Sequence, residues 1–98
     1  MSVLLEFAMF PTDKGESVSP FVARIERVIN AHPFPHQLTA MGTLVETQRM
    51  EEALALIDEC YRALHTDCNR VYCTANIDIR KDVENRLRGK VLSVEEKL

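Results

Sequence analysis

The stretch RVYCTANIDIR, at residues 70–80, alternates apolar and polar residues without a break. Successive side chains of a β-strand point to opposite faces, so this period of two predicts a strand. The run VLLEFAMF at residues 3–10 also has strand length. Val3 and Leu5 would share one of its faces, while Leu4 and Glu6 would share the other. The chain must therefore fold around two long strands, one of which carries an acid in its middle.

Two helices are predicted between these strands. The pair Ser19-Pro20 is typical of a helix start, with Ser19 as the N-cap. An apolar stripe at helical spacing then follows: Phe21, Ile25, Val28, Ile29 and His32. Prolines at positions 33 and 35 end this helix. A second helix is predicted from about Gln48 to His65, with Thr47 as its N-cap. Its apolar stripe comprises Met50, Ala53, Leu54, Ile57, Tyr61 and Leu64.

The stretch QLTAMGTLVE, at residues 37–46, is typical of a β-hairpin with Met41-Gly42 as a two-residue turn. That turn makes the following pairs face each other across the hairpin: Ala40 and Thr43, Leu38 and Val45, Thr39 and Leu44, and Gln37 and Glu46. The first two pairs would face the core, and the last two would face the other side of the sheet.

The predicted order of elements is β-α-β-β-α-β in a single domain spanning residues 1–98. Two right-handed crossovers in this order give an α+β ferredoxin-like sandwich with an antiparallel sheet in the order 4-1-3-2. Both helices then cover one face, and the other face stays open. The segment KDVENRLRGK is interpreted as a polar loop, with Lys90 in a solvated tail. VLSVEEKL is interpreted as a short strand or a helical turn capped by Ser93.

Composition excludes several classes of function. The net charge is −3 and no basic block occurs, so the electrostatic footprint of a nucleic-acid binder is missing. No apolar run approaches membrane-spanning length, and MSVLLEF does not resemble a signal peptide. We therefore expect a cytoplasmic protein, and its three cysteines suit free thiols. Cys60, His65 and Cys68 could be gathered around a metal, but no fourth ligand is apparent, so no metal site is predicted.

The open face combines polar and apolar residues. Glu6 would lie centrally, flanked on one side by Thr74, Asn76 and Asp78 and on the other by Glu46, Thr39 and Gln37. Three interpretations remain open: a subunit interface without ligand, a small-molecule site, and a plain solvated face. RNA binding is disfavoured because acids at these positions would repel phosphate. Glu6 and Glu46 could form an acid–base pair, but no nucleophile accompanies them, so we predict no enzyme.

Four stretches of the chain resemble the small thiamine-binding protein family, the YkoF-like group: MSVLLEFAMFPTDKGESVS, QLTAMGTLVE, DCNRVYCTANIDIRK and KVLSVEEKL. The resemblance implies a ferredoxin-like unit whose sheets pack face to face into dimers and tetramers. It also implies binding of thiamine or its hydroxymethylpyrimidine part, with no catalytic activity established. The chain departs from the family pattern at Thr47, where glycine is frequent, and in KDVENRLRG, which is poorer in glycine.

The resemblance and the open face together predict a set of ligand-binding residues: Glu6, Phe10, Gln37, Thr39, Leu44, Glu46 and Asn76. A carboxylate could accept from the amino group of the pyrimidine or balance the thiazolium charge. Thr39 and Asn76 could complete the pyrimidine edge, and Leu44, Phe10 or Tyr72 could pack on the rings.

The expected partners are thiamine or a related pyrimidine and further copies of the chain, as a homodimer or homotetramer. No cofactor, nucleic acid or membrane is expected. The alternatives are a structural or regulatory oligomer without thiamine affinity and an enzyme of thiamine salvage.

Overall fold

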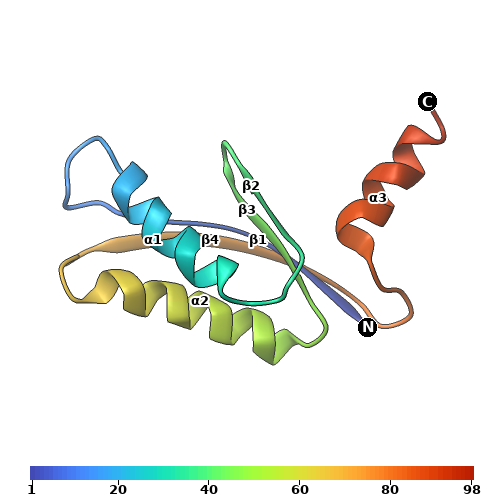
Figure 1. Cartoon of the computed structure of the whole chain (residues 1–98), viewed down its shortest axis with the longest axis horizontal. Coiled ribbons are helices and arrows are strands. Elements are labelled where there is room, and N and C mark those ends of the chain that lie inside the picture. The colour runs from blue at the N-terminus through green and yellow to red at the C-terminus, as the bar shows by residue number, and fades with distance from the viewer.

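A computed structural model describes residues 1–98 as seven elements (Figure 1). They are β1 (Ser2–Pro11), α1 (Ser19–Asn30), β2 (His36–Thr39), β3 (Gly42–Thr47), α2 (Met50–His65), β4 (Val71–Arg80) and α3 (Arg86–Glu95). The strands form one antiparallel sheet in the order β2-β3-β1-β4. This confirms the predicted ferredoxin-like sandwich with strand order 4-1-3-2. None of the helices combines the length and the apolar character needed to cross a membrane.

The core lies between the sheet and the first two helices. The inward face of β1 supplies Val3, Leu5, Phe7 and Met9, all of them buried. The stripe predicted for α1 is confirmed for Ile25 and Ile29, which are buried, and for Phe21 and Val28, which pack against the core. The prediction was wrong for His32, which lies beyond the end of the helix at Asn30. The stripe predicted for α2 is partly wrong. Its buried residues are Ala53, Leu56, Cys60 and Leu64. Leu54 and Tyr61 are exposed, because the buried face is centred on positions 53, 56, 60 and 64.

Both helices begin differently from the prediction. Val18 holds the cap position of α1 without a side-chain hydrogen bond, and Ser19 is already helical. In α2 the cap position belongs to Arg49 rather than to Thr47, which ends β3. The carboxylate of Glu52 accepts the backbone amide of Arg49 at 2.9 Å. The side chain of Glu52 therefore accepts the hydrogen bond from a first-turn backbone amide that the Thr47 hydroxyl was expected to accept.

The hairpin turn lies one residue earlier than predicted. Thr39 pairs with Gly42 and Gln37 pairs with Leu44, so the turn is Ala40-Met41. Each pairing shifts by two residues, an even number, so the residues that stay in the strands keep their predicted faces. Ala40, predicted to pair with Thr43 toward the core, instead lies in the turn and is exposed. Gly42 fixes this register, because a Cβ there would lie 2.8 Å from the Phe7 carbonyl oxygen. Leu38 does not join the core. It is 56% exposed, because β2 is an edge strand.

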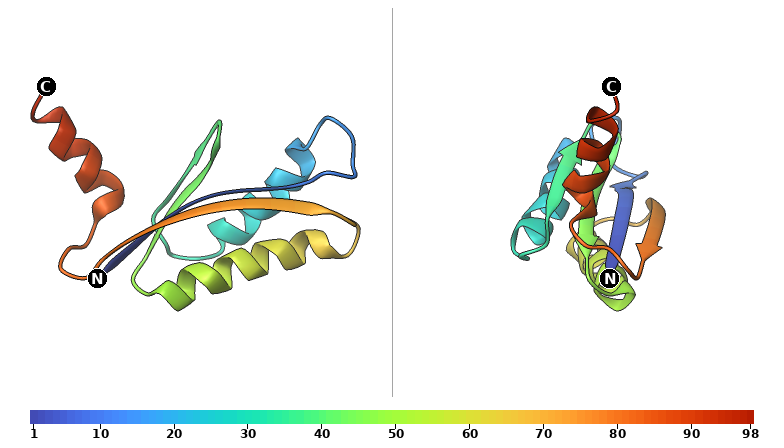
Figure 2. Two further views of the ribbon diagram at one scale, coloured as in Figure 1. Left: turned by 180° about the vertical axis from the view of Figure 1, so that it is seen from behind. Right: turned by 90° about the vertical axis from the view of Figure 1, so that its right-hand side faces the viewer.

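The C-terminal interpretation is right for residues 81–85, which form a loop, and wrong from Arg86 onward. Residues 86–95 form α3 rather than a loop followed by a strand or a capped turn. Ser93 lies inside this helix and caps nothing at its start. Asn85 precedes it in the left-handed region with φ 58°, which asparagine tolerates better than most residues. Figure 1 and Figure 2 show α3 beyond one end of the sheet, standing away from α1 and α2.

Candidate functional site

Four of the predicted site residues lie in one row across the sheet. Gln37 of β2 pairs with Leu44 of β3, Leu44 pairs with Glu6 of β1, and Glu6 pairs with Asn76 of β4. All four side chains belong to the open face, because directly opposite residues in a sheet share a face. The row puts Glu6 on a central strand, with an aliphatic neighbour on one side and an amide on the other.

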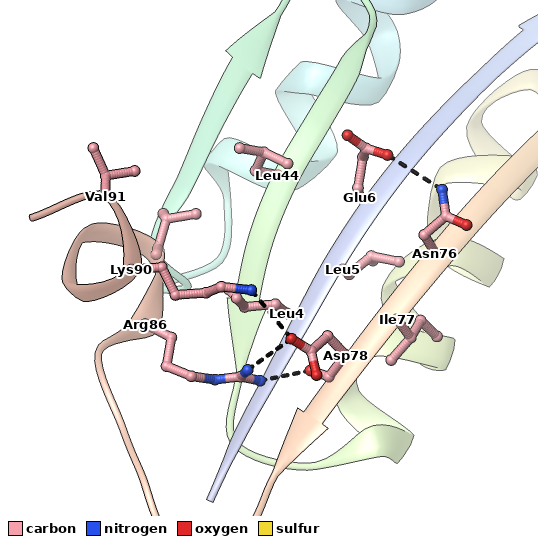
Figure 3. A pocket seen from close by; sticks show the side chains of 11 residues that line it. Leu4, Leu5, Glu6, Leu44, Asn76, Ile77, Asp78, Arg86, Lys90 and Val91 are labelled. Carbon is pink, nitrogen blue, oxygen red and sulfur yellow. Dashed lines mark hydrogen bonds and ion pairs between the residues drawn. The ribbon is translucent and has the colours of Figure 1, made fainter. Parts of the chain in front are cut away.

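A cleft of about 360 Å³ opens over this row at the end of the sheet nearest α3. Figure 3 shows Leu44, Glu6 and Asn76 on one side of it and α3 on the other. Its lining comprises Leu4, Leu5, Glu6, Leu44, Asn76, Ile77, Asp78, Arg86, Leu87, Lys90 and Val91. Its volume is within the range of small-molecule sites, and such sites combine apolar walls with a few polar groups in the same way.

The cleft is lined by two acidic and two basic residues, but both basic residues pair with the same acid. Asp78 accepts from Arg86 at 2.9 Å and from Lys90 at 3.3 Å. These two cations hold the pKa of Asp78 below its ordinary value. Glu6 has only the side-chain amide of Asn76, which donates to it at 3.2 Å (Figure 3). The Glu6 carboxylate is therefore an anion in a largely apolar cleft with no cation beside it.

Glu46 does not line the cleft but lies in a hydrogen-bonded cluster at the base of α3. Its side chain is 7% exposed and accepts three hydrogen bonds at the base of α3. The Ser2 hydroxyl donates to it, and so do the backbone amides of Arg86 at 2.9 Å and Leu87 at 3.0 Å. These amides are unpaired at a helix N-terminus, so Glu46 acts as an N-cap supplied by β3. The site residue expected to contact the ligand instead fixes the helix that walls the cleft.

Arg86 completes this anchor. The residue is 4% exposed. Its Nε donates to the Ser2 hydroxyl at 3.0 Å, and its Nη2 donates to the carbonyl oxygens of Ser2 and Asp78 at 2.9 and 2.6 Å. With the bond to the Asp78 carboxylate, the guanidinium joins α3 to β1 and β4 at once. We call Ser2, Glu46, Asp78 and Arg86 the helix anchor.

The helix anchor predicts a loss of stability in acid. Burial favours the neutral form of Glu46, but the bonds from Ser2, Arg86 and Leu87 outweigh it, and the pKa of Glu46 lies below its ordinary value. A lowered pKa means that the ionised form stabilises the fold above the ordinary glutamate value, and that this contribution disappears as pH falls through the folded value. We expect the free energy of unfolding to decrease below a pH of about 4.5.

Urea unfolding of the wild type and of Glu46→Gln, from pH 7 to pH 3, measures this effect. At pH 7 the variant is expected to be about 2 kcal/mol less stable, since a Gln amide group would face a donor. Its stability should then depend less on pH than that of the wild type. Equal pH dependence in the two proteins would show that Glu46 is not the titrating group.

Phe10 and Thr39 lie away from the cleft. Phe10 packs near Tyr72 at the far end of β1, with ring centroids 6.0 Å apart. Thr39 donates to the Gly42 carbonyl at 2.7 Å and serves the hairpin turn. Both line a second, separate depression of about 290 Å³ between the hairpin tip and α1. The structure thus brings Glu6, Leu44 and Asn76 to one cleft, with Gln37 at the outer end of their row.

The two cysteines considered as metal ligands belong to the core. Cys60 is fully buried, and burial raises the pKa of its thiol to about 12. Cys68 is also buried, with its pKa raised mainly by burial. His65 lies 3.4 Å from the Tyr61 hydroxyl. Thiols that are hard to ionise are poor metal ligands, so these cysteines act as small apolar core residues.

Four lining residues were missed in the sequence because they belong to α3: Arg86, Leu87, Lys90 and Val91. A signal for this helix was present. Leu87, Val91, Val94 and Leu98 follow one another at intervals of four, three and four residues, which is helical spacing. The surrounding charges and Gly89 concealed it. Nothing in the local sequence indicated that Arg86 would be buried.

Comparison with known proteins supports a family assignment. A protein of Methanocaldococcus jannaschii, UPF0045 protein MJ1052, is 32% identical over 94 residues, which cover 96% of this chain and 93% of the relative. Its crystal structure superposes with a TM-score of 0.87 over 97% of both chains. A Thermotoga maritima protein, provisionally assigned to thiamine biosynthesis or salvage, shares the fold with a TM-score of 0.78 at 16% identity, covering 94% of this chain and 99% of that one.

A family model confirms the resemblance noted in the sequence. The model described as "Thiamine-binding protein" matches residues 5–95. That range includes β1 from Leu5 onward, the hairpin, β4 and all of α3, so every residue that lines the cleft except Leu4 lies within it. The chain therefore belongs to the thiamine-binding protein family.

Proposed function

We propose that this protein binds thiamine, or its hydroxymethylpyrimidine part, in the cleft between the open sheet face and α3. The observation that carries the proposal is the Glu6 carboxylate, which has no cation beside it in a cleft with leucine walls. Thiamine has a cationic thiazolium and an aminopyrimidine with an amino donor. A carboxylate between aliphatic side chains suits both features. Family membership supports the same ligand.

Each residue in the row of open-face residues has a separate role in binding the ligand. Glu6 accepts from the amino group or balances the cation, and Asn76 offers a donor and an acceptor to the pyrimidine edge. Leu44 and Leu4 pack against the ring faces, and Gln37 reaches the ligand from the edge strand. Glu46 acts indirectly, by holding α3 in place as the opposite wall. Phe10 and Thr39 contribute to the open face outside the cleft.

We also propose that binding is not accompanied by catalysis and that the protein works as a homo-oligomer in the cytoplasm. The residues that line the cleft include no serine, cysteine or histidine, which are the usual nucleophiles and bases. Lys90 is held by Asp78. The three cysteines are free thiols, which suits a reducing compartment. The small core of a chain this size favours additional burial by self-association.

Glu6→Gln tests the role of the carboxylate. The change keeps the shape of the side chain but removes its charge, so we expect thiamine affinity to fall about tenfold to a hundredfold, as for a charged hydrogen bond of about 1.5–3 kcal/mol. Isothermal titration of the sized protein with thiamine, and then with hydroxymethylpyrimidine, measures this loss.

Glu16→Gln is the matched control, since Glu16 lies in the exposed loop after β1. It should bind thiamine like the wild type. Equal affinities for all three proteins would remove Glu6 from the site. A wild-type protein that gives no heat at millimolar thiamine would refute thiamine binding and leave a structural oligomer. Conversion of thiamine during incubation, followed by chromatography, would instead indicate a salvage enzyme.

A further inference from the structure

The backbone amides at the start of α3 already bind an anion of the protein itself. Helix N-termini are common binding sites for phosphate, because their first amides have no partner within the helix. In α3 the amides of Arg86 and Leu87 both donate to the Glu46 carboxylate, at 2.9 and 3.0 Å. A phosphate group that enters the cleft therefore finds these two amides occupied by a buried carboxylate.

The guanidinium of Arg86 is also fully engaged inside the protein. Arginine suits phosphate binding because its planar group can donate two parallel hydrogen bonds at once. Here Nε and Nη2 donate to the hydroxyl and carbonyl of Ser2, and Nη2 also donates to the Asp78 carbonyl. Nη1 donates to the Asp78 carboxylate at 2.9 Å. Arg86 therefore cannot turn toward a ligand without breaking the helix anchor.

Lys90 is the other cation in the cleft lining, and it also has an acidic partner. Its Nζ lies 3.3 Å from Oδ2 of Asp78, the same oxygen that Arg86 contacts (Figure 3). At this end of the open face, three acids stand against two cations: Glu6, Glu46 and Asp78 against Arg86 and Lys90. The excess negative charge belongs to Glu6, whose side chain contacts only an amide.

The two carboxylates that line the cleft lie near each other on the sheet. Glu6 pairs with Asn76 of β4, and Asp78 is two residues further along the same face. Diagonal neighbours of this kind are about 7–8 Å apart. Arg80, the next residue on this face of β4, pairs with Asp82 at 3.1 Å. A ligand large enough to fill the cleft therefore lies close to both carboxylates, without a free cation beside them.

We infer that the cleft accepts the free alcohol form of its ligand and excludes the phosphate esters of that alcohol. This inference rests on the proposed function, and it specifies which form of the ligand is bound. Thiamine and hydroxymethylpyrimidine each carry a primary alcohol, and a phosphate ester adds about 1.5–2 negative charges near neutral pH. Repulsion from Glu6 then selects against the ester without any further contact. The protein thus holds the substrate of a phosphoryl-transfer reaction and not its product.

Isothermal titration of the wild-type protein with thiamine, and then with thiamine monophosphate, tests this inference. We expect thiamine to bind at least about tenfold more tightly at physiological salt. The difference should shrink at about 1 M salt, where the Debye length is about 3 Å. Equal or tighter binding of the monophosphate, or a preference that salt does not change, would overturn the inference. Thiamine binding without a preference refutes this inference alone, whereas no binding of either compound refutes the proposed function as well.

Val91→Lys places a new cation on the α3 wall of the cleft. Val91 is 55% exposed, so the variant should fold, as circular dichroism can verify. A lysine without an acidic partner attracts phosphate and repels the thiazolium, so the monophosphate should bind at least as tightly as thiamine. Leu92→Lys is the matched control, because it adds the same charge at an exposed position of the same helix outside the cleft lining. It should keep the wild-type preference, and the same ratio of affinities in both variants would overturn the inference.

Discussion

Replacing Arg86 with alanine is expected to lower the free energy of unfolding by about 3–5 kcal/mol, the usual cost of breaking a buried ionic network. The substitution leaves the Ser2 carbonyl and the Asp78 carbonyl without their donor. Glu46 keeps its helix amides but loses the cation nearest to it. Helix α3 should then detach, and hydrogen exchange of its amides should rise to the rate of an unfolded segment.

Arg88→Ala is the control for this experiment. Arg88 is exposed two residues further along the same helix, so its removal changes net charge and helix propensity similarly. We expect Arg88→Ala to change the free energy of unfolding by less than about 0.5 kcal/mol, as is usual at an exposed surface position. Urea unfolding of both variants at one fixed protein concentration measures the difference, so that any dependence of stability on concentration is the same for the two proteins. Similar losses for the two arginines would contradict the anchoring role of Arg86.

Phe7→Ala should lower the free energy of unfolding by about 3–5 kcal/mol. Phe7 is 2% exposed at the centre of β1, so removing its ring leaves a cavity in the core. Phe10 is three residues further along the same strand, on the opposite face. Phe10→Ala should therefore cost much less in the single chain. The comparison tests the assignment of faces on β1 with one chemical change.

The measurement is again urea unfolding at fixed concentration. A loss of this size is comparable to the whole stability of many small domains, so Phe7→Leu provides a milder variant in case Phe7→Ala does not fold. If Phe10→Ala were the more damaging change, β1 would have to present its other face to the helices, and Glu6 would leave the open cleft.

The sheet and its faces could be predicted from the sequence because period-two patterns specify them directly. Val3 and Leu5 alternate with Leu4 and Glu6, and the order of elements leaves few topologies. The predicted hairpin turn was one residue too late. Each cross-strand pairing was therefore wrong by two residues, and the residues that stay in the strands still point to their predicted faces. The sequence of the hairpin alone could not reveal this error. It depends on the close approach of Gly42 to the Phe7 carbonyl, which is a contact between distant segments.

The site could be predicted only in part, for the same reason. Glu6, Leu44 and Asn76 meet because the strand register aligns them. The true role of Glu46 depends on α3, forty residues away, and a charged segment containing a glycine gives little indication of a helix. Helix α3 begins where the Glu46 carboxylate accepts its first backbone amides and where the Arg86 side chain pairs with Asp78 of β4. The spacing of Leu87, Val91 and Val94 is a local helical signal, but Gly89 and the surrounding charges weaken it, so the formation of α3 depends mainly on these tertiary contacts.

The most direct test of thiamine recognition in this cleft is to follow backbone amide NMR shifts of the ¹⁵N-labelled protein during titration with thiamine. We predict saturable shifts at Glu6, Leu44 and Asn76 and at Val91 of α3, with little change along the solvent side of α2. Shifts confined to the depression around Leu38 and Met41, or no shifts at millimolar thiamine, would contradict the account.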